Sequence, residues 1–132
     1  MTAVTVGIRV ITAAGVSGTA TITLKARSPK IFTTNFSGKG AGVVTDQLYN
    51  VISQTLPITP AGTITIWANS LGETTPPVTA GDAAPGGTPV SKAATIPDQV
   101  IVAINGKPAQ VLFAGAAPGF SGLYQINVRP RS

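Results

Sequence analysis

Few side chains in this sequence could carry out chemistry. Histidine and cysteine are both absent from its 132 residues, which removes the commonest general base and metal ligand and every thiol nucleophile. The acids are Asp46, Glu73, Asp82 and Asp98. Hydrolysis by paired carboxylates needs two acids that converge, and only Asp82 with Asp98 is placed so that such a pair is worth testing. The sequence therefore predicts a protein that is not an enzyme and that holds no metal or cofactor.

Aromatic and amide side chains offer more material for a binding site. Sugar sites commonly combine an exposed aromatic face with planar amides. The candidate ligand contacts are Trp67, Asn69, Phe120 and Tyr124, with Tyr49 and Gln125 as further candidates for contact with a sugar. Most of these positions fall in predicted strands, where burial in the core is the commoner alternative. For Phe120 the two interpretations are a plug at the end of the core and an exposed contact.

Charge is spread along the chain. The net charge is +5, from nine lysines and arginines against four acids, and the cations form no run. Modules that bind nucleic acid usually carry clustered Lys and Arg with stacking aromatics, and this sequence has no such cluster. We expect no nucleic-acid partner, and we interpret the charge as a contribution to solubility or as loose attraction to anionic polymers.

The clearest pattern is an alternation of apolar and polar residues in the first 26 positions. It predicts two strands joined by a turn at AAGVSG, with one apolar and one solvent-exposed face. The apolar positions are Val4, Val6, Ile8, Val10, Ala20, Ile22 and Leu24. Two arrangements stay open. The hairpin completes the sandwich of its own chain, as strands adjacent in sequence usually do, or it pairs with a neighbouring copy by strand addition.

The rest of the chain has the patterning of further short strands. They are predicted at 41–53 around Asp46-Gln47, at 62–69, at 98–115 around Asn105-Gly106, and at 123–129. Asn-Gly is the favoured dipeptide of a type I′ turn, because both residues tolerate positive φ. Residues 70–97 are rich in proline and glycine and predict a long loop, packed as an ordered strap.

These elements together predict an all-β fold. Roughly nine short strands separated by turns, without helical periodicity, are typical of an antiparallel immunoglobulin-like β-sandwich with Greek-key connections. We expect a hairpin at residues 1–26, for which both arrangements stay open (completion of its own chain's sandwich, or donation to or sharing with a neighbouring unit), and a β-sandwich domain at 27–132. No stretch reaches the about 18 apolar residues of a membrane span, and the opening MTAVTVGIRV lacks the basic region and apolar block of an export signal.

Three stretches resemble a known family. ARSPKIFTTNFSGKGAGVV, ITIWANSLGETTPPVTAGDAAP and VIVAINGKPAQVLFAGAAPGFSGLYQINV follow, in that order, the pattern of the uncharacterised C-terminal domain found in large secreted and cell-surface proteins of Acidobacteria. The first 26 residues look like the last two strands of the immunoglobulin-like unit that often precedes this domain. The resemblance implies an extracellular or cell-surface location. It implies no chemistry, because the family has no established activity.

Two functions are compatible with these features. The first is a non-catalytic extracellular module for structure or adhesion, which self-assembles with other copies through strand addition or joins adjacent domains of a larger surface protein. The second is a module that binds a carbohydrate or cell-wall polymer. Polymers formed by the purified protein would favour the first, and binding on a glycan array would favour the second.

Overall fold

The computed structural model of the chain describes residues 4–59, 62–86 and 100–131. Among these residues there is no helix, and there are eleven strands where the sequence predicted about nine. In chain order the strands are β1 (Val4–Ile8), β2 (Ile11–Thr12), β3 (Gly15–Val16), β4 (Ala20–Leu24), β5 (Lys30–Ile31), β6 (Val44–Thr45), β7 (Ile64–Asn69), β8 (Ala103–Ile104), β9 (Lys107–Pro108), β10 (Gln110–Ala116) and β11 (Tyr124–Arg129). Every pairing between them is antiparallel.

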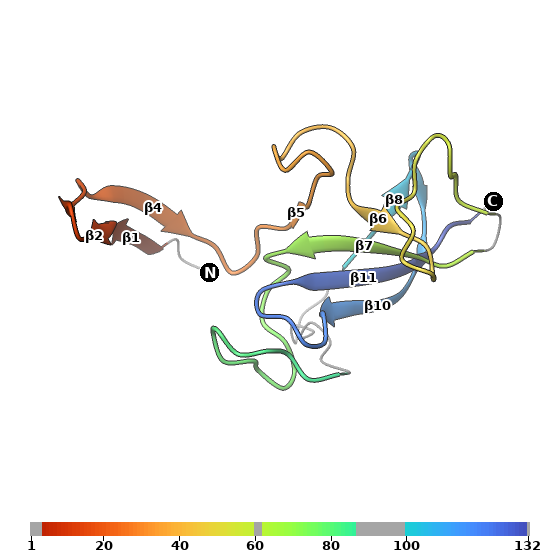
Figure 1. Cartoon of the computed structure of the whole chain (residues 1–132). Helices are drawn as coiled ribbons and strands as arrows, with labels where there is room; N and C mark the ends of the chain where they lie inside the picture. Colours follow the sequence, from red (N-terminus) through yellow and green to blue (C-terminus); the bar gives the residue numbers. More distant parts are fainter. Residues whose placement is uncertain (1–3, 60–61, 87–99, 132) are drawn as a thin grey trace.

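The main sheet has the strand order β10-β11-β7-β5, and β6 also pairs with β7 (Figure 1). β5 pairs with Ala68 and Asn69 of β7, and β6 pairs with Thr65 and Ile66. Since β11 occupies the other edge of β7, β5 and β6 follow one another along a single edge. β11, the last strand of the chain, therefore lies inside the sheet between β7 and β10.

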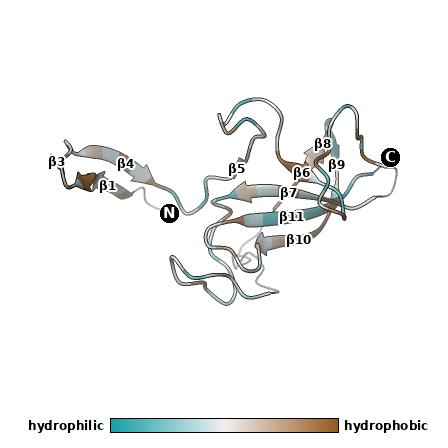
Figure 2. Cartoon of the chain, viewed as in Figure 1, coloured by the Kyte–Doolittle hydropathy of each residue, from teal (hydrophilic) through white to brown (hydrophobic). Residues whose placement is uncertain are grey.

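Alternation along β7 and β11 directs one set of side chains into the core. Ile64, Ile66 and Ala68 are buried, and the residues between them are half-exposed. Ile126 and Val128 face the same side, because they pair across the strands with Ile66 and Ile64. The alternation of apolar and polar residues along the sheet is visible in Figure 2. Partly buried hydrophobic residues pack against this cluster, among them Val44, Ile52, Ile58, Val100, Val102, Ile104 and Ala109.

The turn between β8 and β9 has the predicted conformation. Asn105 and Gly106 have φ values of 51° and 74°, so both turn residues are in the left-handed region that a type I′ turn requires. The paired strands continue with a hydrogen bond of 2.8 Å from the Ala109 amide to the Val102 carbonyl. Val100, Val102, Ile104 and Ala109, in and beside this hairpin, pack against the core on the apolar side of the main sheet.

β1 and β4 form a two-stranded sheet of their own, and β2 and β3 form its tip. Within the described part of the chain these four strands contact none of the other strands, and Figure 1 shows the hairpin projecting away from the main sheet. Of the two open arrangements, the one in which the hairpin completes the sandwich of its own chain is not seen among the described strands. Val10 also differs from the prediction: β1 ends at Ile8, and Val10 lies in the bend before β2, where its amide donates to Ser17 Oγ at 2.8 Å.

The architecture is thus all-β with antiparallel sheets, as the sequence predicted, and it is consistent with a β-sandwich. The division at residues 26 and 27 falls in the connector 25–29 between β4 and β5. Two contacts hold this connector against the end of β7. The Ser28 amide donates to the Ser70 carbonyl at 3.0 Å, and the Arg27 side chain lies directly against Gly72, where a Cβ would come within 2.8 Å of it.

Candidate functional site

The first candidate is the apolar face of the β1–β4 hairpin. The cross-strand pairs Val4 with Leu24, Val6 with Ile22, and Ile8 with Ala20 place all six predicted side chains of the two strands on one face. Val4, Ile8, Ile22 and Leu24 are each between 41% and 50% exposed. The opposite face carries Thr5, Thr21 and Thr23. An apolar stripe therefore faces solvent along the whole hairpin.

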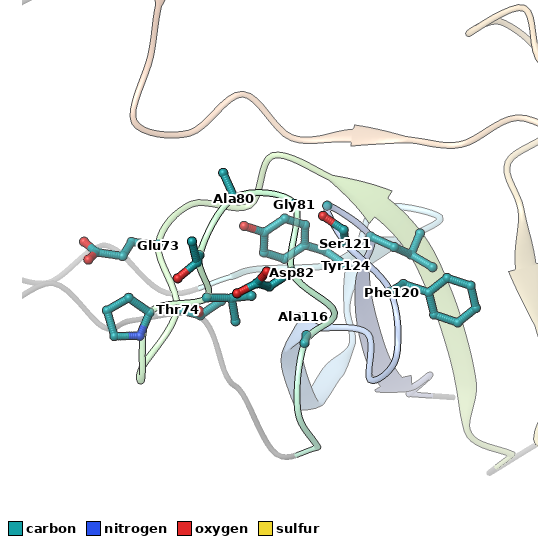
Figure 3. Close-up of a pocket in the computed structure, with 15 residues that line it drawn as sticks. Glu73, Thr74, Ala80, Gly81, Asp82, Ala116, Phe120, Ser121 and Tyr124 are labelled. Atoms are coloured by element: carbon teal, nitrogen blue, oxygen red, sulfur yellow. The ribbon is translucent and has the colours of Figure 1, made fainter.

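The second candidate is a depression of about 480 Å³ between the loop that follows β7 and the loop before β11 (Figure 3). Its wall includes Tyr124, whose hydroxyl donates to the Gly72 carbonyl at 2.6 Å. The Ala84 amide donates to the Phe120 carbonyl at 3.0 Å, and the Gly119 amide donates to the Ala84 carbonyl at 2.8 Å. These bonds hold the two loops together.

Phe120 lies at the rim of this depression and is 58% exposed. The interpretation of Phe120 as a plug at the end of the core is therefore wrong. The reason is local: Gly119 and Gly122 have φ values of 82° and 73°, and the tight turn that they form presents Phe120 outward. Figure 3 shows its ring and the Glu73 side chain extending toward opposite ends of the depression.

The depression is also acidic. Glu73 and Asp82 both line it, and no lysine or arginine among the described residues does. The structure does not test the predicted pairing of Asp82 with Asp98, because Asp98 lies outside the described residues. Among the described residues, no three His, Cys, Asp or Glu side chains gather where they could hold a metal ion. The site therefore offers an apolar rim and negative charge.

The third candidate is a groove of about 220 Å³ on the outer face of the main sheet, the face turned away from the core. Trp67 and Gln125 are cross-strand partners there, as are Thr65 and Asn127. The groove continues onto the turn after β6, which contributes Asp46 and Tyr49. Tyr49 is 76% exposed.

Hydrogen bonds fix several side chains of this groove. The Trp67 indole N–H donates to Thr45 Oγ1 at 3.0 Å, and Thr65 Oγ1 donates to Asn127 Oδ1 at 3.0 Å. Asp46 Oδ1 accepts from the Leu48 amide at 2.8 Å and from the Asn50 amide at 2.9 Å. Hydrogen bonds from the side chain and backbone of Asn50, and from the Leu48 amide, lower the pKa of Asp46 below its usual 3.8, so this carboxylate is ionised at neutral pH.

The four predicted ligand contacts do not form one site. Phe120 and Tyr124 line the acidic depression, Trp67 lines the outer groove, and Asn69 lines a third depression of about 360 Å³ beside Lys30. Asn69 Oδ1 is buried there and has no hydrogen-bond partner among the described residues. Of the further candidates, Tyr49 and Gln125 join Trp67 in the outer groove.

Asn127 and Thr65 belong to the groove and were not among the ligand contacts predicted from the sequence. The alternation of side chains along a strand is the signal that could have identified them. Residues 125 and 127 alternate with buried Ile126 and Val128, so they must share the face that Trp67 occupies once β11 pairs with β7. The pairing itself joins residues far apart in the chain, and the sequence pattern does not specify it.

No protein-family model, no curated protein and no solved structure matches this chain. None of the described residues forms a helix that is long and apolar enough to cross a membrane. The three sites above are therefore the ground for a functional proposal.

Proposed function

We propose that this chain is a non-catalytic structural or adhesion module that assembles with other copies of itself through the β1–β4 hairpin. The observation that carries the proposal is the apolar face of Val4, Ile8, Ile22 and Leu24, which no other described strand covers. A two-stranded hairpin alone in water is marginally stable at best. Covering the exposed part of these side chains would stabilise a contact by on the order of 1 kcal/mol each.

Charge and shape favour a second copy as the partner. The hairpin and its ends carry Arg9 and Lys25, both exposed, and no acid occurs before Asp46. The depression beside Phe120 is lined by Glu73 and Asp82, and none of its described lining residues is a lysine or arginine. We infer that the hairpin of one copy lies against this depression of the next, with its apolar face on Phe120 and its cations near the two acids.

The resemblance described for the sequence supports the setting. A domain like those of Acidobacterial secreted and surface proteins would act outside the cell, joined to other copies or to adjacent domains of a larger surface protein. Within this proposal the body is an immunoglobulin-like sandwich with Greek-key connections. The pairing of β7 with β11, which is not the next strand in the chain, is a crossover that supports such a topology.

The test is the mass of the purified protein across a concentration series, measured by light scattering and mass photometry. The double variant Val6→Thr/Ile22→Thr makes one cross-strand pair polar and keeps two β-branched residues. We expect wild type to form dimers or longer polymers as the concentration rises, and the variant to remain monomeric. Wild-type protein that stays monomeric throughout the series would contradict the proposal.

The matched control is Thr5→Ser/Thr23→Ser, a cross-strand pair on the opposite face of the same hairpin, and it should assemble as wild type does. The acceptor surface has its own test. Arg9→Glu/Lys25→Glu should weaken assembly, and an equimolar mixture with the Glu73→Lys/Asp82→Lys protein should restore mixed oligomers. If assembly requires the hairpin but is unchanged by these charge substitutions, the acceptor surface lies elsewhere on the body.

A further inference from the structure

We propose that the outer groove of the main sheet binds a neutral polysaccharide, with Trp67 and Gln125 as the principal contacts. This site is separate from the hairpin and from the acidic depression, and it adds a ligand to the assembly function. The register places the two residues directly opposite one another on β7 and β11. Cross-strand partners lie about 5 Å apart at Cβ, so an indole and an amide side chain can reach the same ligand.

The side chains of the groove match the chemistry of a sugar. A pyranose ring presents apolar C–H faces, which pack on aromatic rings, and hydroxyl groups at its edge, which pair with amides and hydroxyls. The groove supplies the indole of Trp67 and the phenol of Tyr49 with the amides of Gln125 and Asn127. The Gln125 side chain lines the groove opposite Trp67, where its amide group can donate and accept hydrogen bonds.

The groove is also organised before a ligand arrives. Trp67 is held by its bond to Thr45, a residue only 6% exposed. Asn127 accepts from Thr65 through Oδ1, which leaves its NH₂ group as a donor. Fixing these side chains in advance lowers the conformational entropy lost on binding.

Other ligand classes fit less well. Among the described residues, no lysine or arginine lines the groove, and Asp46 is ionised at its rim, so phosphate groups, uronic acids and other anions would be repelled. The lining is dominated by threonine, amide and carboxylate groups, which would lose hydration against an apolar ligand. An uncharged polyhydroxylated chain is the class that both features favour.

Trp67 is the only tryptophan of the protein, so its fluorescence reports directly on the groove. The probes are cellohexaose and chitohexaose, with hexagalacturonate as an anionic comparison. We expect at least one neutral hexasaccharide to produce a saturable change in intensity or wavelength, and hexagalacturonate to produce none. Absence of a saturable change with both neutral probes, or an equal response to the anionic one, would overturn the proposal.

Variants locate the binding. Gln125→Ala should lower the affinity for the hexasaccharide about fivefold, the loss expected for one hydrogen bond. Tyr49→Ala should lower this affinity as well. The matched control is Gln110→Ala, the same substitution on β10 in the same sheet and outside the groove lining, which should leave affinity unchanged. Equal affinity of Gln125→Ala and wild type would overturn the assignment. The Val6→Thr/Ile22→Thr protein should bind the hexasaccharide as wild type does. A loss of sugar binding can therefore be distinguished from a loss of assembly.

Discussion

Val128 is the residue on which the core depends most directly. Its side chain is 0% exposed and belongs to the buried cluster with Ile64, Ile66 and Ile126. Val128→Ala removes buried methyl groups and leaves a cavity, so we expect it to lower the free energy of unfolding by about 2 kcal/mol. Denaturant unfolding followed by Trp67 fluorescence measures this change. Val10→Ala, at a position 61% exposed, is the control and should change it by less than about 0.5 kcal/mol.

Asp46 makes the turn beside the groove sensitive to acid. Its pKa is lowered chiefly by the Asn50 side-chain amide, so its folded-state pKa lies below the ordinary value of 3.8. For a depressed pKa, the stabilisation is present above the unfolded value and is lost as the pH falls through the folded value. We therefore expect the Leu48 and Asn50 amide resonances to titrate together below pH 3.8 and to stay constant from about pH 5 to 8. Asp46→Asn should abolish this titration, and a midpoint at or above 3.8 would contradict the account.

Among the elements, the hairpin contributes little to the stability of the body. β1 and β4 contact only each other among the described strands, and the connector keeps its own bond from Ser28 to Ser70. Deletion of residues 1–26 should therefore change the free energy of unfolding of the body by less than about 0.5 kcal/mol and should abolish assembly. Unfolding monitored by Trp67 fluorescence measures the first effect and light scattering the second. A markedly destabilised body would mean that the hairpin packs on its own chain in solution.

Some features of the strands could be predicted from the sequence and others could not. β7, β11 and the Asn105-Gly106 turn were predicted correctly, because alternation and positive φ are encoded by neighbouring residues. The pairing of β11 between β7 and β10, and the separation of the hairpin from the body, depend on contacts between distant residues. The same distinction applies to the groove: Trp67 and Gln125 were both candidates, but their adjacency follows from the register of β7 with β11.

At the scale of the whole molecule, the proposed activities occupy three separate surfaces. The hairpin projects at one side of the body (Figure 1). The acidic depression lies between loops, and the outer groove lies across β7 and β11. A copy engaged through its hairpin would therefore keep its groove accessible. An assembly of such copies would present one groove for each subunit, and weak binding at each groove would combine into strong attachment to a long polymer.

The placement of the connector has a mechanical consequence. The hairpin joins β5 beside Asn69, at one end of β7, and β11 reaches Arg129 beside the opposite end of β7. Tension between a captured hairpin and the far end of β11 would pull β5 and β11 in opposite directions along β7. The interstrand hydrogen bonds run perpendicular to that pull. They would therefore be loaded in shear and would have to break together instead of one after another.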